Sequence, residues 1–118
     1  MKQITILFLL LVSTHLSADV AKGKAVYAAN CAICHTTNGG RAMGPDMNLV
    51  AYSRHKKEII AYAKDPDANY KAFGYSANAM PTLPLEDQEF KDVADYISSL
   101  QPFKKWMIKK KKAAPQKN

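Results

Sequence analysis

Both cysteines of the chain lie in one run of five residues, Cys31-Ala32-Ile33-Cys34-His35. In this CxxCH spacing each thiol can add to a vinyl group of haem, while the neighbouring imidazole can bind the iron. The run therefore predicts one covalently bound haem c, attached through Cys31 and Cys34, with His35 as the proximal ligand of the iron.

CxxC spacing also occurs in three other kinds of site: a thioredoxin-like redox pair, half of a zinc site and a plain disulfide. Zinc would need a second pair of ligands, and after the run the chain offers only His55 and carboxylates, which would make a poor set. A thioredoxin-like site would need a strand that leads into a helix, and no such pattern precedes Cys31. A disulfide remains as the alternative, although the histidine next to Cys34 favours haem.

A haem iron held by His35 normally needs a second axial ligand, and a thioether in that place would favour the reduced iron. The candidates are the side chains of Met43, Met47, Met80, Met107 and His55. Met80 is the predicted ligand, because Pro81 fixes the backbone directly after it and biases Met80 toward an extended conformation.

The other candidates have structural interpretations. Met43 and Met47 are expected to pack along the haem edge. His55 lies in a run of basic residues, Arg54-His55-Lys56-Lys57, which is typical of a solvated helix face. For Met80 itself the alternative is a core methionine that fills a gap.

The haem motif is expected at the C-terminal end of a first helix, from Val20 to about Cys34, because Ala, Lys, Val and Tyr dominate this stretch. Glycines and a proline break regular structure after it, which predicts a loop over residues 36–48. A second helix is expected from Asn48 or Ser53, either of which could cap it, to Ala63.

The second half of the chain is predicted to hold a long irregular connection, residues 64–84, with room for one helical turn. Three prolines and a glycine interrupt this connection. A final helix begins with acidic residues that suit its N-terminal dipole and repeats apolar residues at helical spacing: Phe90, Val93, Ala94, Ile97 and Leu100. No strand pattern appears, so the predicted fold class is all-α.

Residues 1–18 predict a secretory signal peptide, with a basic start at Lys2, an apolar run from Ile4 to Val12 and small residues at Ser17-Ala18. The apolar run is too short to cross a bilayer, which takes about 20 residues, and an uncleaved membrane anchor is the alternative. Cleavage after Ala18 would deliver a bacterial chain to the periplasm.

The remaining chain divides into one small domain, residues 19–102, and a basic tail, residues 103–118. The whole chain carries a formal charge of +7, but the tail holds seven lysines and no acids, whereas the domain has nine basic and ten acidic side chains. The lysines from Lys104 to Lys112 would suit an acidic redox partner or an anionic membrane surface, and the alternative is a solvated extension. Binding to nucleic acid is not expected of an exported haem protein.

The haem motif, Gly44-Pro45 and Met80-Pro81 make the chain resemble the class I cytochromes c, of the small bacterial monohaem type, over about residues 20–101. Gly23 and Tyr27 strengthen the resemblance, because they lie eight and four positions before the first haem cysteine, as in that family. The resemblance implies the cytochrome c fold, with about four helices packed around one haem.

The resemblance also implies how the first and last helices meet. Gly23 and Tyr27 would cross the last helix against Val93 and Tyr96. Glycine would let the two helix backbones approach there, and the aromatic rings would fill the crossing.

Around the iron, the resemblance implies that the carbonyl or backbone of Pro45 orients the imidazole of His35. The glycine that is frequent before the Met-Pro pair of the family is replaced here by Asn78-Ala79. Asn78 and Tyr75 are candidates to donate a hydrogen bond to the sulfur of Met80, and either could equally be a surface residue of the loop.

Coordination by both His35 and Met80 would leave no open position on the iron, so the predicted function is that of a one-electron carrier and not an enzyme. Its partners would be a donor and an acceptor protein of a respiratory or other periplasmic chain, and it is expected to be a monomer. Two alternatives stand: a dedicated haem subunit of an oxidoreductase complex, and a haem enzyme or gas sensor with an open sixth site.

Overall fold

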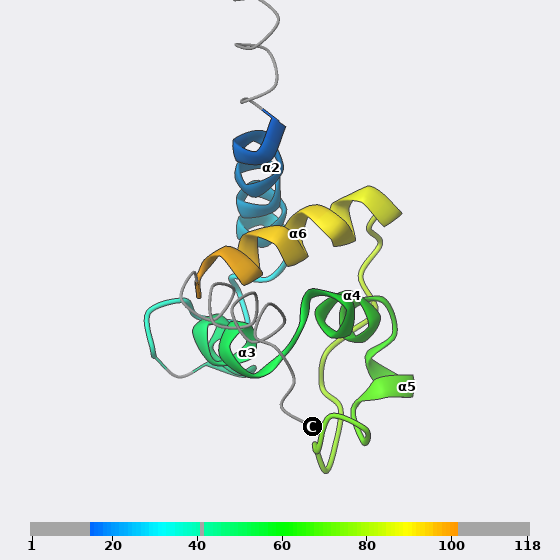
Figure 1. Cartoon of the computed structure of the whole chain (residues 1–118). Coiled ribbons are helices and arrows are strands. Elements are labelled where there is room, and N and C mark those ends of the chain that lie inside the picture. The colour runs from blue at the N-terminus through cyan, green and yellow to red at the C-terminus, as the bar shows by residue number, and fades with distance from the viewer. Residues whose placement is uncertain (1–14, 41, 102–118) are drawn as a thin grey trace, which may run out of the picture.

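The structure is a computed structural model that describes residues 15–40 and 42–101, with side chains from residue 19 onward. Five helices follow one another in these ranges: α2 His15–Asn30, α3 Met47–Ser53, α4 Lys56–Lys64, α5 Pro66–Asn69 and α6 Asp87–Ser99 (Figure 1). No strand occurs among the described residues, which confirms the all-α prediction. Within the same ranges no helix is both long and apolar enough to span a membrane.

Two predicted segments fall largely outside these ranges. The signal peptide expected over residues 1–18 is described only in its last four residues, as the backbone at the start of α2. The basic tail, residues 103–118, lies entirely outside the described residues.

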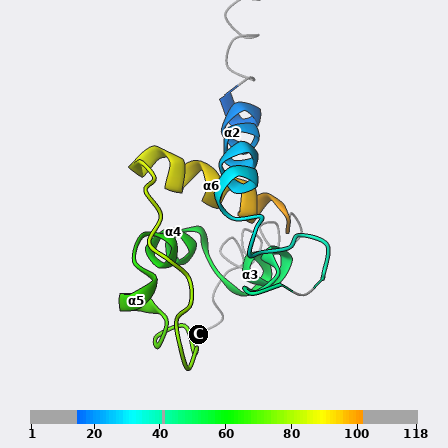
Figure 2. The same cartoon turned by 180° about the vertical axis from the view of Figure 1, so that it is seen from behind.

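Helices α2 and α6 cross against each other, as both views of the fold show (Figures 1 and 2). At the crossing, a Cβ added to Gly23 would overlap the carbonyl oxygen of Asp92 and lie 2.9 Å from the Cβ of Tyr96. The ring of Tyr27 packs on the ring of Tyr96, with 5.4 Å between their centroids. The predicted crossing is therefore confirmed at Tyr96, and glycine is needed there because a side chain would push the two backbones apart.

Helix α2 ends at Asn30, so the prediction that it runs to Cys34 is wrong. The amide of Cys31 still donates to the carbonyl of Tyr27 at 2.8 Å, and a tight turn replaces the helix from there. The hydroxyl of Tyr27 donates to the carbonyl of His35 at 2.9 Å. This hydrogen bond ties the end of the turn back to α2, which places the haem motif across the end of the helix.

The helix predicted to begin at Asn48 or Ser53 and to end at Ala63 is two helices in the structure, α3 and α4: a start at Asn48 is wrong as the start of one continuous helix, whereas the predicted end agrees with that of α4 to within one residue. Arg54 and His55 lie between the two helices and adopt extended conformations, with ψ angles of 147° and 158°. The amide of His55 donates to the carboxylate of Glu58 at 2.6 Å. This bond satisfies an amide at the start of α4 and lets a new helix begin in a new direction.

The cap of α3 also differs from the prediction. Asp46 caps this helix by accepting a hydrogen bond from the amide of Asn48 at 2.8 Å, whereas Ser53 is the last residue of the helix. An acceptor placed just before the first turn satisfies an amide that has no partner within the helix.

The irregular connection predicted over residues 64–84 is confirmed, with α5 as a helical turn inside it. Pro66 begins α5 and is fully buried. The side-chain amide of Asn69 donates to the carbonyls of Ala61 and Asp65, at 3.2 and 2.8 Å, and so ties α5 to the end of α4. The chain then returns past α4 to the start of α6 (Figure 2).

The buried core joins α2, α3, α4 and α6. Each member exposes at most 6% of its surface, and the members are Tyr27, Met47, Ala51, Ile59, Val93, Ala94 and Ile97. The apolar face predicted for the final helix is confirmed, because four of its five residues are buried. This core forms the inner wall against which the candidate site is built.

Candidate haem-binding site

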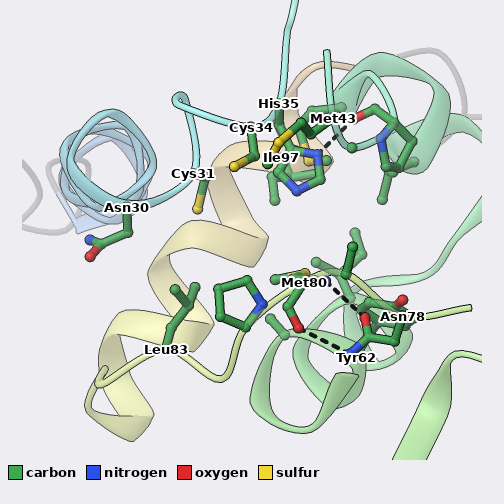
Figure 3. A pocket seen from close by; sticks show the side chains of 18 of the residues that line it. Asn30, Cys31, Cys34, His35, Met43, Tyr62, Asn78, Met80, Leu83 and Ile97 are labelled. Atoms are coloured by element: carbon green, nitrogen blue, oxygen red, sulfur yellow. Dashed lines mark hydrogen bonds between the residues drawn. The ribbon is translucent and has the colours of Figure 1, made fainter. Parts of the chain in front are cut away.

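An apolar cavity of about 310 Å³ opens between the haem motif, helices α3, α4 and α6, and the irregular segment 73–85. All five residues predicted to bind haem or to orient its histidine ligand line this cavity: Cys31, Cys34, His35, Pro45 and Met80. In Figure 3 the haem motif lies on one side of the cavity, and Met80 lies on the other side. The fold thus brings the motif together with a segment that is distant in the chain.

The imidazole of His35 is held in one orientation by the loop that follows the motif. Its Nδ1 lies 2.8 Å from the carbonyl oxygen of Pro45. Because a carbonyl can only accept a hydrogen bond, Nδ1 carries the ring proton and Nε2 keeps the lone pair that an iron ion needs. A Cβ added to Gly44 would overlap the ring, so glycine lets the loop pass close against the imidazole.

Asp46 anchors this loop. One carboxylate oxygen accepts from the Thr36 hydroxyl at 2.7 Å and from the Gly39 amide at 2.8 Å, and the other oxygen caps α3. These hydrogen bonds, the one from Thr36 first, hold the pKa of Asp46 below its usual value. This anchor was not predicted, although an aspartate directly before a helical stretch is a typical cap signal.

We expect Asp46→Asn to lower the melting temperature by about 3–5 °C at neutral pH. Three donors share the two carboxylate oxygens of Asp46, whereas the amide of asparagine has only one acceptor oxygen. A carboxyl group whose pKa is lowered by folding stabilises the folded state at pH values above its pKa in the unfolded chain, 3.8. This stabilisation is lost as the pH falls through the pKa of the folded state. The difference in melting temperature between wild type and variant should therefore shrink below pH 3.8.

Thermal unfolding followed by circular dichroism from about pH 7 to about pH 3 measures this difference. Asp19→Asn is the control, because it makes the same chemical change in the first turns of α2, outside the loop that Asp46 anchors. A difference for Asp46→Asn that stays constant over the whole range would contradict the assignment.

The two thiols lie at one edge of the cavity, are half-buried and are not joined in a disulfide (Figure 3). Burial, and secondly the neighbouring Cys34, raise the pKa of the Cys31 thiol to about 11. As a thiol, Cys31 is therefore protonated at neutral pH. A raised pKa is the opposite of what a thioredoxin-like redox cysteine needs. Among the described residues no group of three or more histidine, cysteine, aspartate or glutamate side chains could hold a zinc ion.

Met80 is positioned through the side chain of Asn78. The amide of Met80 donates to Oδ1 of Asn78 at 3.0 Å, and Nδ2 of Asn78 donates to the carbonyl of Met80 at 3.0 Å. Nδ2 also donates to Oδ1 of Asp67 at 2.7 Å. Both donors of the Asn78 amide are thus used, so the prediction that Asn78 could donate to the sulfur of Met80 is wrong. Tyr75 lines the same cavity and remains a candidate for that role.

The other candidate ligands are placed differently. Met47 lines the cavity as a core residue with 5% of its surface exposed. Met43 lines the rim on the side of His35, next to the loop that packs on the imidazole, and is 82% exposed. His55 is exposed at the start of α4 and does not line the cavity. Met107 lies outside the described residues.

The residues around the cavity fit a haem. A macrocycle needs apolar walls, two thiols at one edge for its vinyl groups, and two axial donors on opposite faces of the iron. The cavity has apolar walls, the CxxCH thiols at its edge, and an imidazole and a thioether on opposite sides (Figure 3).

Comparison with known proteins agrees with this fit. The family model for Cytochrome c matches residues 20–101. This chain belongs to the cytochrome c family. A cytochrome c6 from Synechocystis sp. is 37% identical to it over 89 residues, which cover 72% of this chain and 68% of that protein.

Other similar proteins carry the same name. A cytochrome c6 from Chlorolobion braunii is 35% identical over 95 residues, which cover 75% of this cytochrome c and 99% of that protein. A cytochrome c6 from Gracilaria tenuistipitata var. liui is 34% identical over 85 residues, which cover 69% and 72% of the two chains. No solved structure matches the chain significantly.

Membership of this family gives the cytochrome c its cofactor, covalently bound haem c, and its activity, electron transfer without enzymatic catalysis. The chain contains one CxxCH run, so it is a monohaem cytochrome c. The resemblance to the class I cytochromes c, the haem cofactor and the non-enzymatic function are therefore confirmed.

Arg54 lines the cavity of this cytochrome c, although it lies in the run of basic residues that was predicted to be a solvated helix face. Its guanidinium group donates to the carbonyl of Phe73 at 2.7 Å and lies 4.3 Å from the centroid of the Phe73 ring. No local signal could have revealed this contact, because the two residues are 19 positions apart.

Proposed function

We propose that this cytochrome c carries single electrons between periplasmic redox proteins, with His35 and Met80 as the two axial ligands of its haem iron. The observation that carries the proposal is the placement of these two side chains on opposite sides of one apolar cavity (Figure 3). The similarity to several proteins named cytochrome c6 supports a carrier function.

Each residue of the site has a separate task in this proposal. Cys31 and Cys34 hold the macrocycle through thioether bonds. The carbonyl of Pro45 keeps the proton on Nδ1 of His35 and makes Nε2 a better donor to the metal. The thioether of Met80, a soft ligand, favours the reduced metal. When bound, haem supplies an iron that changes its oxidation state by one electron.

With both axial positions taken by the protein, no substrate or gas can bind to the metal. The chemistry left to the site is electron exchange at its rim. Ile33 and Met43 line the cavity there, with 88% and 82% of their surfaces exposed. A small apolar rim suits the brief, weak contacts that are typical of electron-transfer partners.

We place this exchange in the periplasm, with residues 1–18 as the signal peptide that directs export and cleavage after Ala18. The haem domain, residues 19–102, would act there as a monomer. A dedicated haem subunit of an oxidoreductase would have the same coordination and would differ in copurifying from the periplasm as part of a stable complex.

A redox titration of the purified haem protein with its spectrum tests the proposal. We expect a one-electron transition, a weak near-red absorption band from methionine bound to ferric iron, and no carbon monoxide binding by the reduced protein. A five-coordinate spectrum with ready binding of carbon monoxide would show an open sixth site and would rule the proposal out.

A further inference from the structure

Three hydrogen bonds connect Met80 to helix α5 through one side chain. Asn78 holds both backbone groups of Met80, its amide and its carbonyl, at 3.0 Å each. The second donor of the same amide group reaches Oδ1 of Asp67 at 2.7 Å. Figure 3 shows the two bonds between Asn78 and Met80 at the lower side of the cavity.

This connection matters because the segment around Met80 has no regular structure of its own. Residues 75–86 contain no helix or strand. Pro81 follows Met80 and has no amide hydrogen to donate. The side chain of Asn78 therefore supplies the order that a helix or sheet would otherwise give to the backbone of Met80.

The far end of the connection is fixed. Asp67 belongs to α5, whose first residue, Pro66, is fully buried. The last residue of α5, Asn69, donates to the carbonyl of Ala61 in α4 at 3.2 Å. A hydrogen bond to Asp67 thus links the backbone of Met80 to the packed helices and not to another irregular segment.

We propose that Asn78, anchored by Asp67, is the positioning residue that keeps the sulfur of Met80 on the haem iron. The inference rests on the proposed ligation by His35 and Met80. A ligand on an irregular loop can leave the metal when the loop moves, and the metal then offers an open position. The apparent affinity for an added ligand reports this opening, because it is proportional to the fraction of molecules in which the position is open.

The test is a titration of the ferric haem protein with imidazole, followed by the loss of the near-red band. For Asn78→Ala we expect about tenfold tighter apparent binding than for wild type, which corresponds to about 1.4 kcal/mol. For Asp67→Ala, which removes the anchor and leaves Asn78 in place, we expect about threefold tighter binding. Asp67→Asn keeps an acceptor oxygen for Nδ2 of Asn78 and should restore an affinity close to that of wild type.

Ser76→Ala is the matched control, because Ser76 is an exposed polar residue of the same segment. The inference is supported if Asn78→Ala and Asp67→Ala bind imidazole more tightly than wild type and Ser76→Ala does not. The far-ultraviolet circular dichroism of all three variants should equal that of wild type. If Asn78→Ala does not bind haem, the comparison of Asp67→Ala with Asp67→Asn still decides it.

Equal affinities in wild type, Asn78→Ala and Asp67→Ala, with the near-red band present in all three, would overturn the inference and leave the proposed ligation intact. Absence of the near-red band from the wild-type protein would instead overturn the proposed ligation by Met80. The two failures are therefore distinguishable in one set of spectra.

Discussion

Met80→Ala is expected to abolish the near-red absorption band of the ferric protein and to lower its reduction potential by about 0.1–0.2 V, part of the range of about 0.8 V that axial ligands cover. Alanine has no donor atom, so the sixth position of the iron opens to water or to added ligands. The reduced metal also loses the soft thioether that favours it. The reduced variant should therefore bind carbon monoxide, whereas the wild type should not.

Met43→Ala is the matched control, because Met43 also lines the cavity but lies on the side of His35. Its band and potential should remain those of the wild type. Redox titration and absorption spectra of both variants show whether Met80 is the ligand of the iron. A Met80→Ala protein that kept the band and the potential would identify another residue as the ligand.

Gly23→Ala is expected to lower the free energy of unfolding of the haem protein by about 2–3 kcal/mol, as over-packed cores do. The added Cβ would overlap the backbone carbonyl of Asp92 and press on the Cβ of Tyr96. That carbonyl belongs to α6 and cannot turn aside alone, so the two helices must separate. Alanine gains about 1 kcal/mol in helix propensity over glycine, which offsets only part of the cost.

Equilibrium unfolding in urea measures this difference. Ala25→Ser, at an exposed position of the same helix, is the control and should change the free energy of unfolding by no more than about 0.5 kcal/mol. An unfolding midpoint of Gly23→Ala equal to that of wild type would show that the crossing can open without cost.

The helical boundaries show where sequence patterns reach their limit. The apolar spacing of α6 predicted its buried face, because burial on one side imposes a periodicity that the sequence displays. The sequence left the start of the second helix open between Asn48 and Ser53, because neither Arg54 nor His55 is a glycine or a proline and both are compatible with a helix. The break follows from packing: α3 and α4 pack against different parts of α6 in different directions (Figure 1).

The candidate site divides in the same way. The spacing within residues 31–35 and the pair Met80-Pro81 pointed to haem and to candidate ligands without any structure, because attachment and local stiffening depend on neighbours in the chain. For His35 the resemblance already pointed to Pro45 as the orienting residue, whereas the atoms that hold Met80 in place were not accessible to such reasoning. Asn78 was a predicted candidate to donate to the sulfur, whereas both hydrogens of its amide group are donated to Asp67 and to the backbone carbonyl of Met80.

By itself, the sequence therefore determined the cofactor, the all-α class and the set of residues from which the ligands come. These properties depend on short spacings and on the periodicity of single helices. Only the tertiary structure decided that the carbonyl of Pro45 selects the tautomer of His35 and that Asp67 anchors the loop of Met80. These contacts join residues 10 and 11 positions apart across loops, and their geometry depends on how the separate helices pack.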